Sequence, residues 1–295
     1  MISYALRRAW AYLEMVKIEH TLFAAPFCLS ALLVATGGRP SGRLVVWVVV
    51  ALTAARSAAM AFNRIVDAHL DALNERTRGR HIPRGVITRG AAIGFTATAA
   101  ALFVIAAWQL NGLALALSPA ALLVVLGYSY TKRWTRWSHM VLGLALSIAP
   151  VGAWVAARGK IEFPPLVLAA GVVAWVAGFD ILYALQDLAF DRSIGLHSLP
   201  AALGPARALW IARLLHALSA LALLGFGGVA GLGTAYFVGV LLMAALIAYE
   251  HTLVGPQDLS RVNTAFFTVN GTVSLVFLAA TAVDLYVLGR AVPRP

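Results

Sequence analysis

Two groups of polar side chains recur in steps of four residues. The first contains Asn63, Asp67 and Asp71, and a second, similar group ends in Asp187 and Asp191. Residues four apart share one face of an α-helix, so each group is expected to form a strip of oxygen ligands. Carboxylate oxygens suit Mg²⁺, which prefers to bridge protein carboxylates to phosphate. The spacing therefore predicts a Mg²⁺-diphosphate site, the alternative being two solvated helix ends paired with nearby arginines.

Basic and aromatic residues surround the two groups. A carboxylate–Mg²⁺ site flanked by Lys and Arg would form a clamp for a diphosphate. The alternative for each basic residue is the ordinary excess of positive charge in cytoplasmic loops. Lys132 is a candidate catalytic residue, together with Asp67, Asp71, Asp187 and Asp191. The candidates for substrate binding are Arg76, Tyr130, Arg133, Asp180, Tyr183 and Arg192.

Arg56 lies within an apolar run, seven residues before Asn63. Two helical turns would place it on the same face as the first group but about 10 Å deeper in the membrane. An arginine inside a membrane is a functional candidate because its charge is costly there. It is expected either to bind the carboxylate of a small acceptor in a bidentate manner or to pair with a carboxylate of the two groups.

The composition requires a membrane to house these residues. The chain has 295 residues, of which 61% are hydrophobic and 12% charged, and its mean hydropathy is +0.84. The net charge of +11 is attributed to Lys and Arg beside anionic lipid rather than to nucleic-acid binding. The single cysteine, Cys28, excludes an intrachain disulfide and a cysteine-cluster metal site.

Apolar runs long enough to cross a bilayer predict an all-α bundle of about nine transmembrane helices. An interfacial helix is expected before the first span, and the distribution of basic residues predicts a cytoplasmic N-terminus. Two long polar loops, 63–90 and 187–206, are then expected on the cytoplasmic side as active-site loops of one domain, 1–295. The runs centre on 20–36, 44–62, 91–108, 113–129, 139–157, 164–186, 207–228, 234–250 and 265–288.

An internal similarity suggests two related halves of four helices each, followed by a ninth helix. A shift of 116 residues aligns Asp71 with Asp187 and Glu75 with Asp191, and both segments follow an apolar span. Because an even number of spans separates them, both polar segments are predicted to emerge on one face of the membrane.

The motifs resemble the signatures of the UbiA family of intramembrane aromatic prenyltransferases, most closely the 4-hydroxybenzoate polyprenyltransferase branch. The first signature is carried by Asn63-Arg-x-x-Asp67-x-x-x-Asp71, and the second by Asp180-x-x-Tyr183-x-x-x-Asp187-x-x-x-Asp191. The resemblance implies a nine-helix bundle with a central cavity. It also implies that Mg²⁺ and the prenyl diphosphate are held by Asn63, Asp67, Asp71, Asp187 and Asp191.

One residue departs from the family pattern: Arg64 stands where many members have Asp, which removes one possible metal ligand. The expected reaction is Mg²⁺-dependent transfer of a polyprenyl group to an aromatic acid in ubiquinone or menaquinone biosynthesis. Either 4-hydroxybenzoate or 1,4-dihydroxy-6-naphthoate would offer Arg56 a carboxylate. Asp191 or the released diphosphate would accept the ring proton.

Two other functional classes remain as alternatives. A secondary transporter also has internal repeats, but its charges usually lie near the membrane midplane. A membrane alcohol phosphotransferase also binds Mg²⁺ through Asp clusters, but it gathers them in one segment. The acidic groups here are divided between two helices and lie at helix ends, which favours the prenyltransferase.

Overall fold

Long apolar segments separated by short breaks of Gly, Pro and Asn make the chain helical. The computed structural model describes residues 2–17 and 21–288, with side chains for 9–17 and 23–288. The elements in chain order are α1 (Ile2–Met15), α2 (Thr21–Ala35), α3 (Gly42–Val66), α4 (Ala68–Leu73), α5 (Arg89–Leu110), α6 (Gly112–Gly127), η2 (Tyr128–Arg133), α7 (Ser138–Arg158), α8 (Phe163–Ala184), η3 (Leu185–Asp187), α9 (Leu188–Ser193), α10 (Leu199–Leu203), α11 (Pro205–Val229), α12 (Thr234–Leu253), η4 (Thr264–Val269) and α13 (Asn270–Tyr286).

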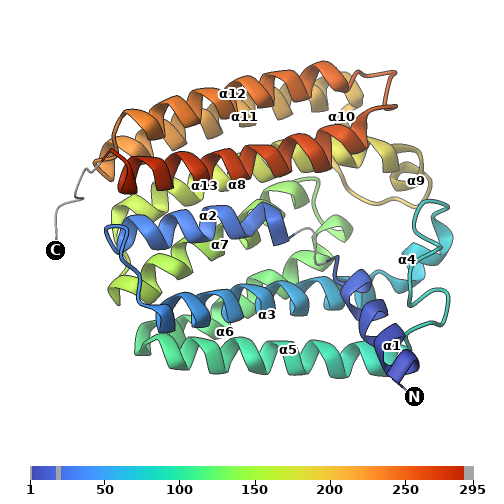
Figure 1. The fold of residues 1–295 in the computed structure, drawn as a ribbon. Helices are drawn as coiled ribbons and strands as arrows, with labels where there is room; N and C mark the ends of the chain where they lie inside the picture. Colours follow the sequence, from blue (N-terminus) through green and yellow to red (C-terminus); the bar gives the residue numbers. More distant parts are fainter. Residues whose placement is uncertain (1, 18–20, 289–295) are drawn as a thin grey trace. The chain divides into compact units, whose positions relative to one another are not determined.

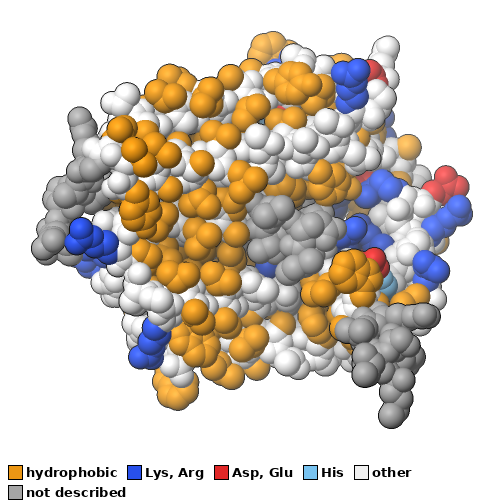
Figure 2. Space-filling model, in the orientation of Figure 1, with side chains coloured by type: hydrophobic (Ala, Val, Ile, Leu, Met, Phe, Trp, Pro, Cys, Tyr) orange, Lys and Arg blue, Asp and Glu red, His pale blue; other side chains and the backbone are white. Residues whose placement is uncertain are grey.

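The prediction of an all-α transmembrane bundle is confirmed. Within the described residues, eight helices are long and apolar enough to cross a membrane, and α2 is a shorter apolar helix that makes the ninth. The short break predicted between the third and fourth spans is real, because Asn111 ends α5 and its Oδ1 accepts the Ala114 N–H at the start of α6. Figure 2 shows hydrophobic side chains along the sides of the helices and Lys and Arg near helix ends.

The chain forms two compact units. Unit 1 contains residues 1–21 and 46–130, and unit 2 contains residues 22–45 and 131–295. These units do not coincide with the predicted four-helix halves, because α2 belongs to unit 2. The Phe27 ring of α2 stacks on Phe277 at 4.6 Å and lies 4.9 Å from Trp175.

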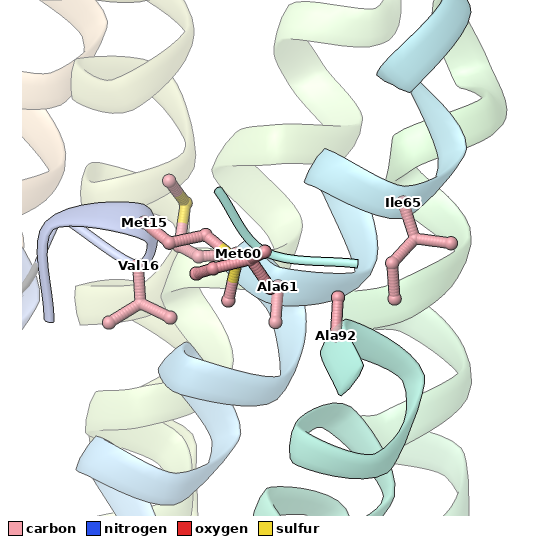
Figure 3. Packing of buried hydrophobic residues seen from close by; sticks show 7 residues of the cluster. Met15, Val16, Met60, Ala61, Ile65 and Ala92 are labelled. Carbon is pink, nitrogen blue, oxygen red and sulfur yellow. The ribbon is translucent and has the colours of Figure 1, made fainter. Parts of the chain in front are cut away.

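Unit 1 anchors the first polar loop through a small hydrophobic cluster. Met15 and Val16, at the end of α1, pack with Met60 and Ala61 of α3, and Ala92 of α5 completes the contact (Figure 3). The cluster closes the base of loop 63–90, since α3 leads into that loop and α5 leaves it.

Helix α8 is the centre of unit 2 and packs between α7 and α11, whereas α12 and α13 run side by side (Figure 1). Small residues permit these close approaches. A Cβ added at Gly143 of α7 would lie 2.5 Å from the Val173 carbonyl oxygen, and one at Gly178 of α8 would lie 2.3 Å from the His216 ring. Close helix packing through small residues is typical of membrane proteins.

Candidate active site

The first acidic group lies in unit 1, where α3 ends and the short helix α4 begins. Asn63 Nδ2 donates to Asp67 Oδ2 at 2.9 Å, and Arg64 Nη1 donates to Asn63 Oδ1 at 3.3 Å. Asp71 is buried, and its Oδ1 forms an ion pair with Arg80 Nη1 at 2.5 Å. The predicted helical strip of Asn63, Asp67 and Asp71 is therefore formed, with two arginines beside it.

The loop after α4 folds back onto that strip. Buried Thr77 donates through its hydroxyl to the Asp71 carbonyl at 3.2 Å. Arg76 is exposed, and its backbone N–H donates to Asn74 Oδ1 at 3.0 Å. Arg80 of this loop, which the sequence analysis did not single out, thus pairs its guanidinium with an acidic residue of this group.

The second acidic group lies in unit 2, between α8 and α10. Asp191 is buried, its Oδ2 lies 3.7 Å from Lys132 Nζ, and it accepts a hydrogen bond from Ser198. Backbone contacts fix the arrangement, since Lys132 O accepts the His197 N–H at 2.7 Å and Asp191 O accepts the Leu196 N–H at 2.8 Å. Lys132 is therefore positioned beside Asp191, a pairing that the sequence did not predict.

Both groups use the same local backbone structure. Asp67 directly precedes α4 with φ −91° and ψ 3°, and Asp187 directly precedes α9 with φ −96° and ψ 4°. Asp71 and Asp191 are then the fourth residues of two six-residue helices, and both are buried. Asp187 follows Asp67 by 120 residues, as Asp191 follows Asp71, so the shift of 116 residues predicted from the sequence is wrong by one helical turn.

Among the described residues, Oδ2 of Asp71 and Oδ2 of Asp191 accept no hydrogen bond, and Oδ2 of Asp191 has only the longer 3.7 Å contact with Lys132 Nζ. Leaving such an acceptor unsatisfied costs about 1–3 kcal/mol or more for a charged group. No three His, Cys, Asp and Glu side chains in the described parts of the chain are grouped to hold a metal by themselves. Buried carboxylate oxygens that accept no hydrogen bond fit Mg²⁺, which takes one or two carboxylates and completes its shell with water and phosphate oxygens.

Asp180 has a partner that the sequence did not reveal. Its Oδ2 accepts from His139 Nδ1 at 2.6 Å, and His139 Nε2 accepts the Leu199 N–H at 3.4 Å. Because Nε2 accepts the Leu199 N–H, Nδ1 is the ring nitrogen that donates to Asp180. The histidine is fully buried and ties α7 to α8 and α10. A lone histidine at the start of an apolar run gives only a weak sequence signal.

The remaining candidates lie on the same elements. Arg56 is half-buried on α3, two turns before Asn63. Tyr130 in η2 is exposed and meets Phe62 edge-on at 6.0 Å, and Arg133 ends the same turn. Arg192 is exposed and its Nε donates to the Ala201 carbonyl at 3.3 Å.

Tyr183 lies one turn before Asp187 and faces aromatic side chains. Its ring lies 4.2 Å from that of Phe266 and 6.2 Å from that of Phe267, centroid to centroid. Phe179, one turn further back on α8, meets Phe266 edge-on at 5.3 Å. The approach to the second acidic group along α8 is thus lined by aromatic rings.

Comparison with known proteins agrees with this arrangement. The sequence model of the UbiA prenyltransferase family matches residues 24–278. A protein named 4-hydroxybenzoate octaprenyltransferase, from Aeromonas salmonicida (strain A449), is 30% identical over 274 residues, which are 92% of this chain and 94% of that protein.

Solved structures resemble the fold over nearly its whole length. The apo structure of a UbiA homologue from Aeropyrum pernix K1 has a TM-score of 0.82 and 34% identity, covering 90% of this chain and 98% of that one. A UbiA homologue from Archaeoglobus fulgidus, bound to DMAPP and Mg²⁺, has a TM-score of 0.69 and 19% identity, covering 94% and 99%. The family match, the near-complete coverage and the paired acidic groups lead to one conclusion: this chain belongs to the UbiA prenyltransferase family of membrane enzymes.

Proposed function

We propose that this enzyme transfers a polyprenyl group from a prenyl diphosphate to an aromatic acid, with 4-hydroxybenzoate as the leading acceptor and quinone biosynthesis as its role. The observation that carries the proposal is the pair of buried aspartates, Asp71 and Asp191, at matching positions and each with an unsatisfied oxygen. Relatives named 4-hydroxybenzoate octaprenyltransferase support the acceptor. The homologue bound to DMAPP and Mg²⁺ supports the donor and the metal.

Residues 1–295 would then act as one domain in which Asn63, Asp67, Asp71, Asp187 and Asp191 hold Mg²⁺ and the diphosphate. Bound Mg²⁺ would offset the negative charge that develops on the leaving diphosphate. Lys132, fixed by its backbone carbonyl and paired with Asp191, would bind a diphosphate oxygen directly. Arg76, Arg133 and Arg192 lie on the adjoining loops, where their charge would favour the same anion.

The bond changes are those of an electrophilic aromatic substitution. The bond between prenyl C1 and the diphosphate oxygen breaks, and its electron pair leaves with the diphosphate. A ring carbon of the acid attacks the resulting allylic cation, and a C–C bond forms. The ring proton then passes to Asp191 or to the released diphosphate. Tyr183 and its aromatic neighbours would exclude water, which would otherwise capture the cation.

The acceptor's carboxylate is assigned to Arg56. A guanidinium within an apolar helix segment can bind a carboxylate bidentately, and α3 places Arg56 two turns from the first acidic group. 1,4-Dihydroxy-6-naphthoate also carries an aromatic carboxylate and is the second candidate acceptor. Asp180, whose carboxylate is oriented by His139, would form a hydrogen bond with the acceptor from the α8 side.

The test is turnover by the purified full-length enzyme in detergent. Geranyl diphosphate and longer prenyl diphosphates are supplied with each of the two acids, with and without Mg²⁺, and products are identified by mass. We expect a prenylated acid only when Mg²⁺ is present, and the faster acid identifies the acceptor. Absence of product with every acid, while an active family member forms product under the same conditions, would exclude the proposal. Uptake of a solute by proteoliposomes without product would instead support a transporter.

A further inference from the structure

A chain of buried hydrogen bonds crosses unit 2 away from the acidic group. Trp175 Nε1 on α8 donates to Asn270 Oδ1 at 2.8 Å, and Asn270 Nδ2 donates to Glu250 Oε1 on α12 at 2.6 Å. All three side chains are 0–1% exposed. A carboxyl group buried among membrane helices is costly and is usually functional. None of these three residues takes part in the chemistry described above.

Asn270 also fixes an unusual piece of backbone. It is the first residue of α13 and directly follows η4, a π-helical turn of residues 264–269. Its Nδ2 makes a second hydrogen bond, to the Ala265 carbonyl inside that turn, at 3.1 Å. A π turn contains one extra residue, which rotates the preceding side chains by about 100° relative to a regular α-helix. Such turns often occur at functional sites.

The side chains that this turn directs are Phe266 and Phe267. Phe266 packs on both Phe179 and Tyr183 of α8, and Phe267 lies 4.8 Å from Phe266 and 6.2 Å from Tyr183. We refer to Phe179, Tyr183, Phe266 and Phe267 as the aromatic wall. Phe267 is 36% exposed, so part of this ring is not covered by the described part of the chain.

The wall and the hydrogen-bond chain share one strip of α8. Trp175, Phe179 and Tyr183 follow in steps of four, and the next step is Asp187. One helical turn is about 5.4 Å long. A prenyl chain whose diphosphate is bound at Asp187 and Asp191 would therefore meet Tyr183 with its first isoprene unit. Trp175 at the far end of the strip also touches Phe179, at 4.9 Å between ring centroids.

We propose that the Trp175–Asn270–Glu250 chain is a positioning device that holds the π turn, and through it the aromatic wall, against the first isoprene units of the prenyl diphosphate. The three residues do not touch the reacting atoms. They act by fixing Phe266 and Phe267, which contact the allylic group. The proposal rests on the prenyl-diphosphate site proposed above, and it assigns a binding and orientation role to residues outside the acidic groups.

The experiment compares variants of the full-length enzyme in detergent. Asn270→Ala removes the hydrogen bonds of Asn270 to Trp175, Glu250 and the Ala265 carbonyl. Trp175→Phe removes only the indole N–H and keeps an aromatic ring. Glu250→Gln keeps an acceptor for Asn270 and is the conservative variant. Tyr236→Phe is the matched control. The buried hydroxyl of Tyr236 donates to the Leu223 carbonyl at 2.7 Å, and neither residue belongs to the aromatic wall. For each, kcat and KM are measured for geranyl diphosphate and for the aromatic acid, together with equilibrium binding of geranyl diphosphate in Mg²⁺ and thermal unfolding.

We expect Asn270→Ala to lower kcat/KM for geranyl diphosphate by roughly 10- to 100-fold through a misplaced wall, with the KM for the acid unchanged. Trp175→Phe should also lower kcat/KM for geranyl diphosphate, and Glu250→Gln should have a kcat/KM close to that of the wild type. Tyr236→Phe should lower the unfolding temperature only. Wild-type kinetic constants and binding in Asn270→Ala would overturn the inference, as would a change limited to the unfolding temperature. If Asn270→Ala does not fold, Trp175→Phe decides on the same criteria.

Failure of the underlying function has a different signature. If the wild-type enzyme prenylates none of the acids, the proposed function fails. Binding of geranyl diphosphate, which needs no acceptor, then still tests the positioning role. Weakened binding in Asn270→Ala and Trp175→Phe with intact binding in Glu250→Gln supports the positioning role. Equal binding in these three variants and the wild type contradicts it.

Discussion

Three buried aspartates show how surroundings decide the role of one residue type. Asp284 on α13 accepts the Gly233 N–H at 2.6 Å and the Tyr236 N–H at 3.4 Å, so both of its oxygens serve the start of α12. Asp71 and Asp191 each keep one oxygen without a hydrogen-bond partner in the described part of the chain. A carboxylate with satisfied oxygens is a structural cap, whereas the other two retain capacity for a cation.

This difference predicts that an Asp→Asn substitution affects activity at Asp71 and Asp191 but stability at Asp284. Asp191→Asn and Asp71→Asn keep the shape of the side chain but remove its charge, and we expect kcat to fall by roughly 100-fold or more. Asp284→Asn is the matched control and should lower the unfolding temperature while leaving kcat nearly unchanged. Turnover as a function of Mg²⁺ concentration and thermal unfolding measure the two effects. Full activity of Asp191→Asn at every Mg²⁺ concentration would refute its role at the metal.

A second residue-scale prediction concerns Glu162, between α7 and α8. Hydrogen bonds from Lys160 (2.8 Å), Trp154 (2.7 Å) and Arg158 (3.3 Å) lower the pKa of Glu162 from 4.5 to about 2. A lowered pKa in the folded state stabilises the protein above the unfolded pKa, and this contribution is lost as pH falls toward 2.

We therefore expect Glu162→Gln to lower the unfolding temperature at pH 7. The difference from wild type should shrink as the pH falls below 4.5, the ordinary pKa from which that of Glu162 is lowered. Thermal unfolding of both proteins across this pH range is the measurement. A difference that stays constant down to pH 3 would show that packing, and not the charge of Glu162, is responsible.

At the scale of elements, close contacts of α8 with its neighbours organise unit 2. Its path is fixed by glycines on both sides: Gly143 of α7 meets the Val173 carbonyl, and Gly178 of α8 meets the His216 ring. Because interiors are close-packed, an added methyl group at such a contact forces the helices apart. The spacing of α7 and α8 in turn sets the His139–Asp180 hydrogen bond.

Gly143→Ala and Gly152→Ala test this on one helix. A Cβ at Gly143 would lie 2.5 Å from a backbone oxygen, whereas one at Gly152 would meet nothing within 4 Å. We expect Gly143→Ala to destabilise the protein by about 1–3 kcal/mol. Gly152→Ala should be neutral or stabilise it by up to about 1 kcal/mol, since Ala favours helix. Equal unfolding temperatures for the two variants would argue against close packing at Gly143.

At the scale of the whole molecule, the spans and the basic loops define a topology. The eight long apolar helices and α2 account for the hydrophobic sequence within the described residues. The excess of Lys and Arg predicts that loops 63–90 and 187–206 face the cytoplasm. The diphosphate is the water-soluble headgroup of the prenyl substrate. The cytoplasmic side would therefore also be the side from which the headgroup enters.

Cysteine accessibility checks the orientation. The single cysteine, Cys28, is buried, so Cys28→Ala gives a background without reactive thiols. Arg78→Cys places a thiol in loop 63–90, and Lys160→Cys places one at an exposed position between α7 and α8. A membrane-impermeant maleimide applied to intact cells should label only Lys160→Cys, and both after permeabilisation. Labelling of Arg78→Cys in intact cells would reverse the assigned orientation.

The sequence by itself determined the fold class and the spans, and it predicted the acidic residues of the candidate site. Apolar runs of span length and residues spaced by four depend on helix geometry alone, which is local. The same locality explains why Arg80 could not be identified in advance as a partner of Asp71, since the loop also contains Arg76, Arg78 and Arg84.

Only the tertiary structure decided which long-range partners these residues have. The pairing of Asp180 with His139, the Trp175–Asn270–Glu250 chain and the place of α2 in unit 2 join segments far apart in sequence. The matching register of the two acidic groups, 120 rather than 116 residues, also required backbone conformation, because a shift of one turn keeps the same helix face. Side-chain contacts between distant segments depend on how the helices pack, which no local pattern of residues records.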